Sequence, residues 1–346
     1  MCKTTRVFTG LKPTGRLQLG NYLGAIAPVL TLAGNPAHDV LVCVVDLHAL
    51  TVEHEPVRLR THTLEMATTL LACGLGESAT VFVQSTVPAH TELSYLLEST
   101  ATYGEMHRMI QFKDKRASSA STRLSLLTYP ALMAADILVH RADVVPMGED
   151  QRQHLELTLT LARRFNKRYG EVFTVPRAAE PPAAARVRDL RDPTAKMGKS
   201  GADPSGVLFL LDDPDTLVAK VRRAVTDDDP TLAYDDPDRP GVANLVILLA
   251  ALTGCSPARA QAGLSGAVAL KAAVADAVVA TVEPIQRRYR ELAAYPREVR
   301  DTLAAGATAV TGSAQHTLDS ARAAIGLLEA GEHPTRQTVS QGNEIR

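Results

Sequence analysis

The fold of this chain is decided by its opening stretch, Val7-Phe8-Thr9-Gly10-Leu11-Lys12-Pro13-Thr14-Gly15-Arg16-Leu17-Gln18-Leu19-Gly20-Asn21-Tyr22-Leu23-Gly24-Ala25. A short apolar strand leads through a turn rich in Gly and Pro into a helix whose first turn holds Gly20 and Asn21. The free amide N–H groups and the dipole at the start of a helix favour anions. The stretch therefore predicts a phosphate site, although glycines that merely allow a strand to pack closely on a helix would give the same pattern.

Outward from this stretch, strands and helices alternate. Strands are expected at residues 5–10, 40–45 and 80–84, and the last two are apolar without alternation, as is typical of parallel strands covered on both faces. Helices are expected at 21–33 and 56–73. This order predicts an α/β fold with a doubly wound parallel sheet, in which ligands bind at the carboxyl ends of the strands.

The second part of the chain reads differently. Residues 176–185, rich in Pro and Ala, are expected to form a loop, and beyond about Pro204 the pattern is helical apart from an acidic loop at 226–240. We therefore divide the chain into a catalytic domain, residues 1–204, and a mainly helical domain, residues 205–346, whose last helices could pack back on the first domain.

The composition limits the class of protein. Of 346 residues, 45% are hydrophobic and 22% charged, and the net charge of −1 excludes a globally basic surface for nucleic acid. The N-terminus has no signal-peptide pattern, and no apolar run would span a bilayer. The four cysteines form no CxxC pair. We expect a cytoplasmic protein with reduced thiols, without a disulfide framework or a metal site.

A second motif is Lys196-Met197-Gly198-Lys199-Ser200, which follows Asp192-Pro193. Two lysines three residues apart in a loop of small residues form a flexible cationic clamp suited to phosphate. Taken alone, such a pair is more often a solvated surface.

A third motif is Thr128-Tyr129-Pro130-Ala131-Leu132-Met133-Ala134-Ala135-Asp136-Ile137-Leu138. Pro130 suits the first turn of a helix, on which Tyr129, Met133 and Asp136 share one face. An aromatic ring, a thioether and a carboxylate on one face would bind a flat apolar ring with one N–H donor. An amphipathic helix with Met in the core and Asp at its edge is the commoner origin of such a pattern.

A fourth motif, Asp143-Val144-Val145-Pro146-Met147-Gly148-Glu149-Asp150-Gln151-Arg152-Gln153-His154, predicts a strand, a turn and a helix. Asp150 is well placed as the N-cap of that helix.

Together these motifs resemble the class I aminoacyl-tRNA synthetases, and in particular the bacterial tryptophanyl-tRNA synthetases. The first signature of that family usually reads His-Ile-Gly-His or Thr-Ile-Gly-Asn, and here Gln18-Leu19-Gly20-Asn21; the second reads Lys-Met-Ser-Lys-Ser, and here Gly198 replaces the first serine. The runs 45–51, 111–115, 128–138 and 143–170 also match, so the resemblance extends from Val7 past Arg290. A tyrosyl enzyme shares the fold, but its sequences lack the run 128–138.

The resemblance implies a Rossmann-type catalytic domain, a helical domain that binds the tRNA anticodon, and a homodimer. It implies a tryptophan–tRNA ligase that uses ATP with Mg²⁺ to form tryptophanyl-adenylate and then charges tRNA(Trp). The residues it assigns to catalysis are Lys196, Lys199, Lys115 and Asn21. Those it assigns to ATP are Lys12, Thr14, Gln18, Gly20, Asn21, Gly148, Asp150, Val187, Lys196, Met197, Lys199 and Ser200. Those it assigns to tryptophan are Phe8, Gly10, His48, Tyr129, Met133, Asp136, Val145, Met147 and Gln151.

Two other functions stay open on the sequence alone. One is a synthetase-derived regulator that no longer charges tRNA, which the departures at Gln18 and Gly198 permit. The other is a small-molecule nucleotidyltransferase on the same fold, against which the helical second domain and its basic run Arg287-Arg288-Tyr289-Arg290 argue. Lys12 stands where bacterial relatives generally have Gln. Since Lys offers no hydrogen-bond acceptor, we hypothesise that this enzyme is an auxiliary copy that tolerates tryptophan-like inhibitors.

Overall fold

The structure is a computed structural model that describes residues 4–116, 122–148, 151–179, 187–198, 204–227, 229, 231–236 and 238–328. Within these ranges the chain forms a five-stranded parallel sheet in the order β3-β2-β1-β4-β5. The strands are β1 Thr5–Leu11, β2 His38–Val44, β3 Thr80–Val83, β4 Val144–Pro146 and β5 Arg177–Ala179.

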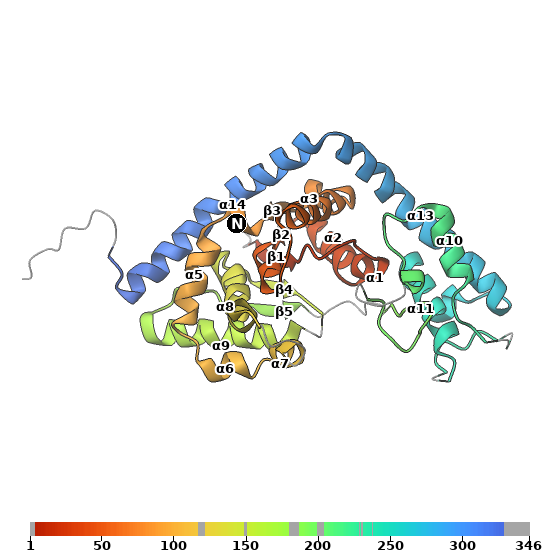
Figure 1. The fold of residues 1–346 in the computed structure, drawn as a ribbon, viewed down its shortest axis with the longest axis horizontal. Coiled ribbons are helices and arrows are strands. Elements are labelled where there is room, and N and C mark those ends of the chain that lie inside the picture. The colour runs from red at the N-terminus through yellow and green to blue at the C-terminus, as the bar shows by residue number, and fades with distance from the viewer. Residues whose placement is uncertain are drawn as a thin grey trace, which may run out of the picture.

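Helices cover both faces of this sheet (Figure 1). The first part of the chain forms α1 Leu19–Asn21, η1 Tyr22–Ile26, α2 Ala27–Ala33, η2 Leu47–Thr51, α3 Pro56–Ala72, α4 Leu75–Ser78, η3 Gln84–Thr86, α5 Ala89–Glu98, α6 Tyr103–His107, α7 Ile110–Arg116, α8 Leu124–Val139 and α9 Arg152–Tyr169. Side chains alternate along β2, so that Val40 and Val42 pack with α2 and α3, whereas Leu41 and Cys43 pack with α5 and α8. The result is the three-layered, doubly wound arrangement that the sequence predicts.

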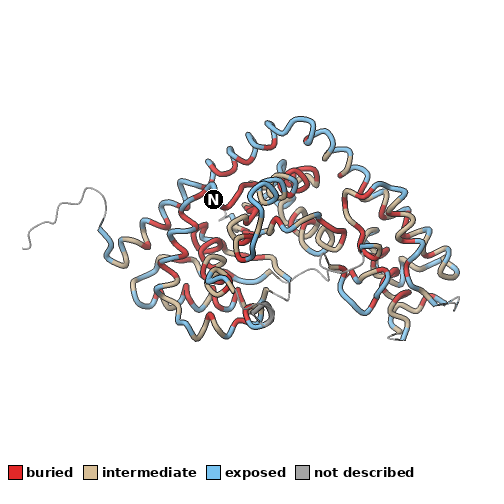
Figure 2. The backbone as a smooth tube through the Cα atoms, viewed as in Figure 1, coloured by how far each residue is buried: buried red, intermediate tan, exposed pale blue. Residues whose placement is uncertain are grey.

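The second part of the chain is helical. It contains η5 Pro204–Gly206, α10 Pro214–Arg222, α11 Pro240–Thr253, α12 Pro257–Ala260, α13 Gly266–Ala294 and α14 Pro296–Ile325. In Figure 1, α13 and α14 form a long bent arm that leads from α10 and α11 back to the sheet. Figure 2 shows buried positions gathered at the sheet and where α10, α11 and α13 meet.

The return of α14 to the sheet depends on one glycine. A Cβ atom on Gly306 would lie 2.1 Å from the carbonyl oxygen of Val81 on β3. Only a residue without a side chain lets the helix backbone approach the edge strand this closely. Arg322, near the end of α14, forms an ion pair with Glu92 on α5.

Four local expectations need correction. The expected helix at 21–33 is interrupted by the π-helical turn η1. Pro28 cannot donate a backbone hydrogen bond, and in a regular α-helix its ring would clash with the carbonyl one turn earlier. The wider π-helical turn avoids that clash. Pro130 lies inside α8, which begins at Leu124, because the burial of Leu126 and the turns after Pro130 offsets the lost bond.

The other two corrections concern a strand that was expected to be a loop and the first residue of a helix. Residues 177–179, expected in a loop, add the edge strand β5 beside β4. The N-cap residue of α9 is Gln151 rather than Asp150, and the Gln151 side chain makes no capping hydrogen bond. Asp150 itself lies outside the described residues.

Candidate functional site

The order of the strands reverses between β1 and β4, which makes their carboxyl ends the topological switch point of the sheet. The chain leaves β1 through Lys12 and Thr14 towards the first signature, and it leaves β4 through Met147 and Gly148. The sequence-predicted residues Phe8, Gly10 and Val145 lie on these two strands or at their ends. Ligands of doubly wound folds bind in this crevice.

The first signature starts a helix with its own cap. The side-chain oxygen of Gln18 accepts a hydrogen bond from the Gly20 amide at 2.5 Å, and the Asn21 side chain accepts one from the Gln18 amide at 3.4 Å. Gly20 and Asn21 are partly exposed, whereas Gln18 is 3% exposed. The backbone N–H groups of this turn are therefore occupied within the protein: that of Gly20 by the Gln18 side chain, that of Leu19 by the Leu208 carbonyl, and those of Asn21 and Tyr22 by the Gln18 carbonyl.

The second signature lies directly against the first. The Gln18 side-chain amide donates a hydrogen bond to the Met197 carbonyl at 2.8 Å. Met197 is buried in the core and its amide donates to the Val187 carbonyl at 3.2 Å, while Lys196 is exposed. The side chains of Val187 and Met197 are thus committed to the core. Lys199 and Ser200 lie outside the described residues, as does the side chain of Lys115, whose backbone belongs to α7.

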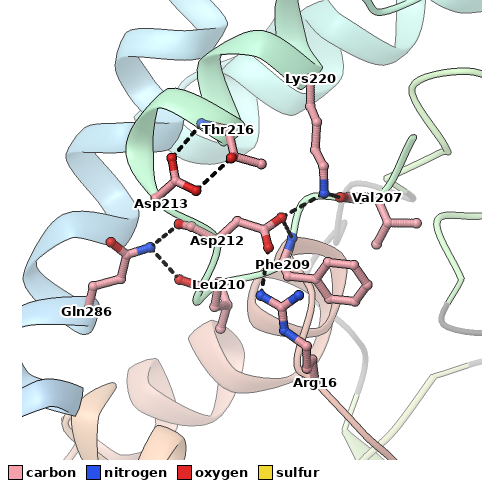
Figure 3. A network of polar contacts seen from close by, with 9 residues as sticks. All are labelled: Arg16, Val207, Phe209, Leu210, Asp212, Asp213, Thr216, Lys220 and Gln286. Carbon is pink, nitrogen blue, oxygen red and sulfur yellow. Dashed lines mark hydrogen bonds and ion pairs between the residues drawn. The ribbon is translucent and has the colours of Figure 1, made fainter. Parts of the chain in front are cut away.

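The segment that follows the second signature is fixed by a polar network centred on Asp212 (Figure 3). The Asp212 carboxylate accepts hydrogen bonds from Arg16 at 2.6 Å and Lys220 at 2.7 Å. Gln286 of α13 donates to the carbonyls of Leu210 and Asp212 at 2.8 and 2.5 Å. Asp212 is 8% exposed, whereas the Arg16 side chain is half exposed, and the charge-assisted hydrogen bonds between them connect the two parts of the chain.

Asp136 on α8 is the centre of a second buried network. One carboxylate oxygen, Oδ1, accepts from Gln84 at 2.6 Å and from His90 at 2.7 Å. The other, Oδ2, accepts from His48 Nε2 at 2.8 Å. A carboxylate has about four acceptor positions. Among the described residues three are used, which leaves one position on Oδ2 for a further donor.

These contacts set the charge of the network. Burial raises the pKa of Asp136, but hydrogen bonds and charge from His48 and His90 outweigh that effect and hold the pKa at about 2. Asp136 is therefore an anion at neutral pH. Burial and the neighbouring His90 lower the pKa of His140 to about 3. The Nδ1 atom of His140 is buried with no partner among the described residues, so a proton there would lack an acceptor.

Aromatic side chains extend the site on both sides of Asp136. Phe8 on β1 stacks on His140, with ring centroids 5.6 Å apart. The Tyr129 ring meets His48 edge to face at 6.1 Å, and its hydroxyl lies 2.5 Å from His154 Nε2. Burial raises the pKa of Tyr129, which therefore stays a neutral hydrogen-bonding group. Tyr129 and Met133 are half-buried, as is suitable for side chains that line a binding site.

The Lys12 side chain reaches η2, which follows β2. Its ammonium group lies 3.2 Å from the Thr51 hydroxyl, and that hydroxyl donates to the His48 carbonyl at 2.9 Å. The side chain is therefore held near η2 at the end of β2.

The sequence interpretation missed several members of the site. Gln84 and His90 hold Asp136, and His140 extends this network, but none of the three was predicted. The sequence feature that could have identified Gln84 is its position at the carboxyl end of the apolar strand β3, where ligands of parallel sheets bind. Arg16, Asp212 and Gln286 of the other network gave no signal, because their contacts span up to 196 residues of sequence.

Two negative findings apply to the described part of the chain. No group of three or more His, Cys, Asp or Glu side chains there is arranged to hold a metal ion. None of its helices is long and apolar enough to cross a membrane.

Comparison with known proteins identifies the family. The family described as tRNA synthetases class I (W and Y) matches residues 1–283. The chain is 51% identical over 330 residues to tryptophan–tRNA ligase 1 of Streptomyces avermitilis, covering 94% of this chain and 99% of that one. It is 52% identical over 329 residues to tryptophan–tRNA ligase 1 of Streptomyces coelicolor, covering 94% and 98%.

Solved structures agree. Tryptophanyl-tRNA synthetase of Mycoplasma pneumoniae superposes with a TM-score of 0.86 at 34% identity, covering 94% of this chain and 98% of that one. The enzyme of Campylobacter jejuni complexed with ADP and tryptophan gives 0.79 at 29% identity, covering 93% and 100%. The chain therefore belongs to the bacterial tryptophanyl-tRNA synthetases of class I, which are tryptophan–tRNA ligases.

Proposed function

We propose that the crevice at the carboxyl ends of β1 and β4 activates tryptophan, with the indole ring between α8 and β4 and the ATP phosphates at the first signature. The observation that carries this assignment is the buried, ionised Asp136, whose Oδ2 atom retains one acceptor position beside Tyr129 and Met133. An indole offers one N–H donor on a flat apolar ring. The free acceptor position on Asp136 and the neighbouring Tyr129 and Met133 side chains match this N–H donor and this ring.

The reaction needs positioning and charge neutralisation rather than a protein nucleophile. The tryptophan carboxylate attacks the α-phosphorus of ATP in line, and the bond to pyrophosphate breaks. In this proposal Lys196, Lys199 and Lys115 neutralise the leaving pyrophosphate, while Gly20 and Asn21 bind the nucleotide. The terminal ribose hydroxyl of the tRNA then attacks the adenylate carbonyl and expels AMP.

The other substrate-binding residues divide between the two ligands. Gln151 and His48 would hold the amino and carboxyl groups of tryptophan, and Phe8, Gly10, Val145 and Met147 would line its pocket. Lys12, Thr14, Gly148 and Asp150 would approach ATP, along with the backbone of Val187, Met197 and Ser200. Mg²⁺ would arrive bound to the phosphates of ATP, as part of the substrate.

The partners of the catalytic part are also proposals. Residues 205–346 would bind the anticodon of tRNA(Trp), supported by the helical arm and the arginines at 287, 288 and 290. A homodimer is supported by four large apolar side chains with exposures of 59–72% between α5 and α8: Tyr95, Tyr103, Ile110 and Leu124. The cytoplasm is the proposed location, because tRNA charging supplies protein synthesis there. We also propose that Lys12 makes this enzyme tolerant of tryptophan-like inhibitors, supported by its ammonium group on the Thr51 hydroxyl, which itself bonds the His48 carbonyl.

ATP–pyrophosphate exchange with each standard amino acid, followed by charging of tRNA(Trp), tests this function. We expect exchange that depends on tryptophan, and subsequent charging of the tRNA. Exchange without charging would favour a small-molecule nucleotidyltransferase. Loss of both would favour a regulator derived from a synthetase.

A further inference from the structure

The Gln18 side chain hydrogen-bonds both signatures. It stands where the family usually has His or Thr. Its amide donates to the Met197 carbonyl at 2.8 Å and its carbonyl accepts from the Gly20 amide at 2.5 Å. At 3% exposure, both ends of the amide are turned inward, away from solvent.

We call residues 196–199, which carry the two lysines, the lysine segment. The backbone on either side of Gln18 bonds the chain that follows this segment. Leu19 donates its amide hydrogen to the Leu208 carbonyl at 2.8 Å, and Leu210 donates to the Leu17 carbonyl at 3.0 Å. Gln18 thus meets the chain before residues 199–203, while its two neighbours bind the chain after them. The later part is fixed independently by Arg16, Asp212 and Gln286 (Figure 3). The earlier part is held by the Gln18 amide, together with the hydrogen bond from the Met197 amide to the Val187 carbonyl and the burial of Met197 in the core.

The second departure from the family lies one residue beyond this contact. Gly198 replaces a serine, which removes a hydroxyl and increases the conformational freedom of the backbone next to Lys199. A side-chain bond to the neighbouring Met197 carbonyl restricts that same backbone. The two departures therefore have opposite effects on one segment.

We propose that Gln18 is a positioning residue which docks the lysine segment on the first signature and thereby compensates for Gly198. Gln18 acts through the backbone of Met197 on Lys196 and Lys199, and it touches neither substrate. Its contribution is to keep the lysines where the pyrophosphate leaves. The inference rests on the proposed role of those lysines in adenylate formation.

The test compares three variants with the parent in tryptophan-dependent ATP–pyrophosphate exchange. Gln18→Glu keeps an acceptor for Gly20 but replaces the donor to Met197 with an oxygen. Gly198→Ser restores the family residue, alone and combined with Gln18→Glu. Asn166→Asp is the matched control, because the Asn166 amide is also buried and donates to a backbone carbonyl, that of Phe173, at 2.8 Å.

Two further measurements separate docking from folding. Because the chain contains no Trp, the fluorescence of tryptophan itself reports its binding without background from the protein. Trypsin cleavage after Lys196 reports undocking, because Met197 is 1% exposed and must leave the core to be cut there.

We expect Gln18→Glu to lower kcat about tenfold, since it removes one hydrogen bond and sets two oxygens against each other. Tryptophan affinity should stay within about twofold, and cleavage after Lys196 should accelerate by a similar factor to the loss of kcat. Gly198→Ser should restore part of kcat in the Gln18→Glu background and change the parent little. Asn166→Asp should leave both kcat and the cleavage rate at parental values.

Parental kcat in Gln18→Glu would overturn the proposal, and so would faster cleavage without loss of kcat. Equal effects of Gly198→Ser in the two backgrounds would overturn the compensation. An inactive parent would instead contradict the proposed function, which keeps the two failures distinct.

Discussion

Replacing Asp136 by Asn tests how the site recognises tryptophan. The Asn oxygen can take the place of only one carboxylate oxygen. At Oδ1 it keeps two bonds, to Gln84 and His90, whereas at Oδ2 it keeps one, to His48. We therefore expect the oxygen at the Oδ1 position and the NH₂ group at the Oδ2 position. There the NH₂ group would face the indole N–H with a second donor.

The magnitude follows from the loss of one hydrogen bond to a charged acceptor. Such a bond contributes about 1.5–3 kcal/mol, which corresponds to a factor of about 10–150 in kcat/KM. The matched substrate is 3-benzothienylalanine, which replaces the N–H of tryptophan by sulfur in a ring of nearly the same shape. The parent should prefer tryptophan over this analogue by that factor, and Asp136→Asn should discriminate less than about fivefold.

Stability should change less than selectivity in this variant. Asp136→Ala leaves three buried donors unpaired and should lower the free energy of unfolding by about 3–5 kcal/mol. Asp136→Asn keeps two of them, and His48 can change tautomer to accept from the new amide, so about 1–2 kcal/mol is expected.

The low pKa of Asp136 adds an acid dependence. The carboxylate stabilises the parent above its unfolded pKa of 3.8, and that contribution is lost as the pH falls towards about 2. Urea unfolding followed by circular dichroism measures both effects. An Asn variant that still discriminates tryptophan from the analogue as the parent does would refute recognition by Asp136.

Three further predictions concern other parts of the molecule. Lys196→Ala should lower kcat of adenylate formation more than it raises the KM for tryptophan, because the charge acts on the leaving pyrophosphate. Replacing the exposed Lys167 by Ala is the control, and an unchanged kcat in Lys196→Ala would show that Lys196 is only a solvated surface residue. Lys12→Gln should bind an uncharged indole-bearing inhibitor more tightly than the parent, measured as inhibition constants, and equal constants would reject inhibitor tolerance. Gly306→Ala should lower the free energy of unfolding by about 2–4 kcal/mol, because its Cβ would meet a β3 carbonyl at 2.1 Å; Gly312→Ala on the same helix, with nothing within 4 Å of its Cβ, should be neutral or stabilising, and equal effects would refute the close approach of α14.

The fold could be predicted from local pattern because its strands are apolar runs separated by helices of regular spacing. The apolar runs 40–45 and 80–84 are β2 and β3 to within a few residues. The short strand β5 escaped prediction, since three residues of Arg and Ala have no apolar period and become a strand only by pairing with β4. The position of Pro130 inside α8 was likewise decided by tertiary packing of Leu126.

Part of the candidate site could be proposed from the sequence, where polar and aromatic residues are concentrated in short motifs. Asp136, Tyr129 and Met133 follow each other on one helix face, which the sequence indicates directly. The partners of Asp136 could not be predicted from the sequence, because Gln84 and His90 lie 52 and 46 residues away along the chain and meet Asp136 only in the folded sheet. The Gln18 side chain meets Met197 across 179 residues, so that its role depends on the order of the strands.

We propose above all that the indole of tryptophan binds at the switch point with Asp136 as its acceptor. A crystal structure of the chain with bound tryptophan measures this directly, as the distance from the indole nitrogen to Asp136 Oδ2. We predict a hydrogen bond of about 2.7–3.2 Å, with His48 still bound to the same oxygen. An indole nitrogen directed to any other group, or tryptophan bound away from β1 and β4, would contradict the account.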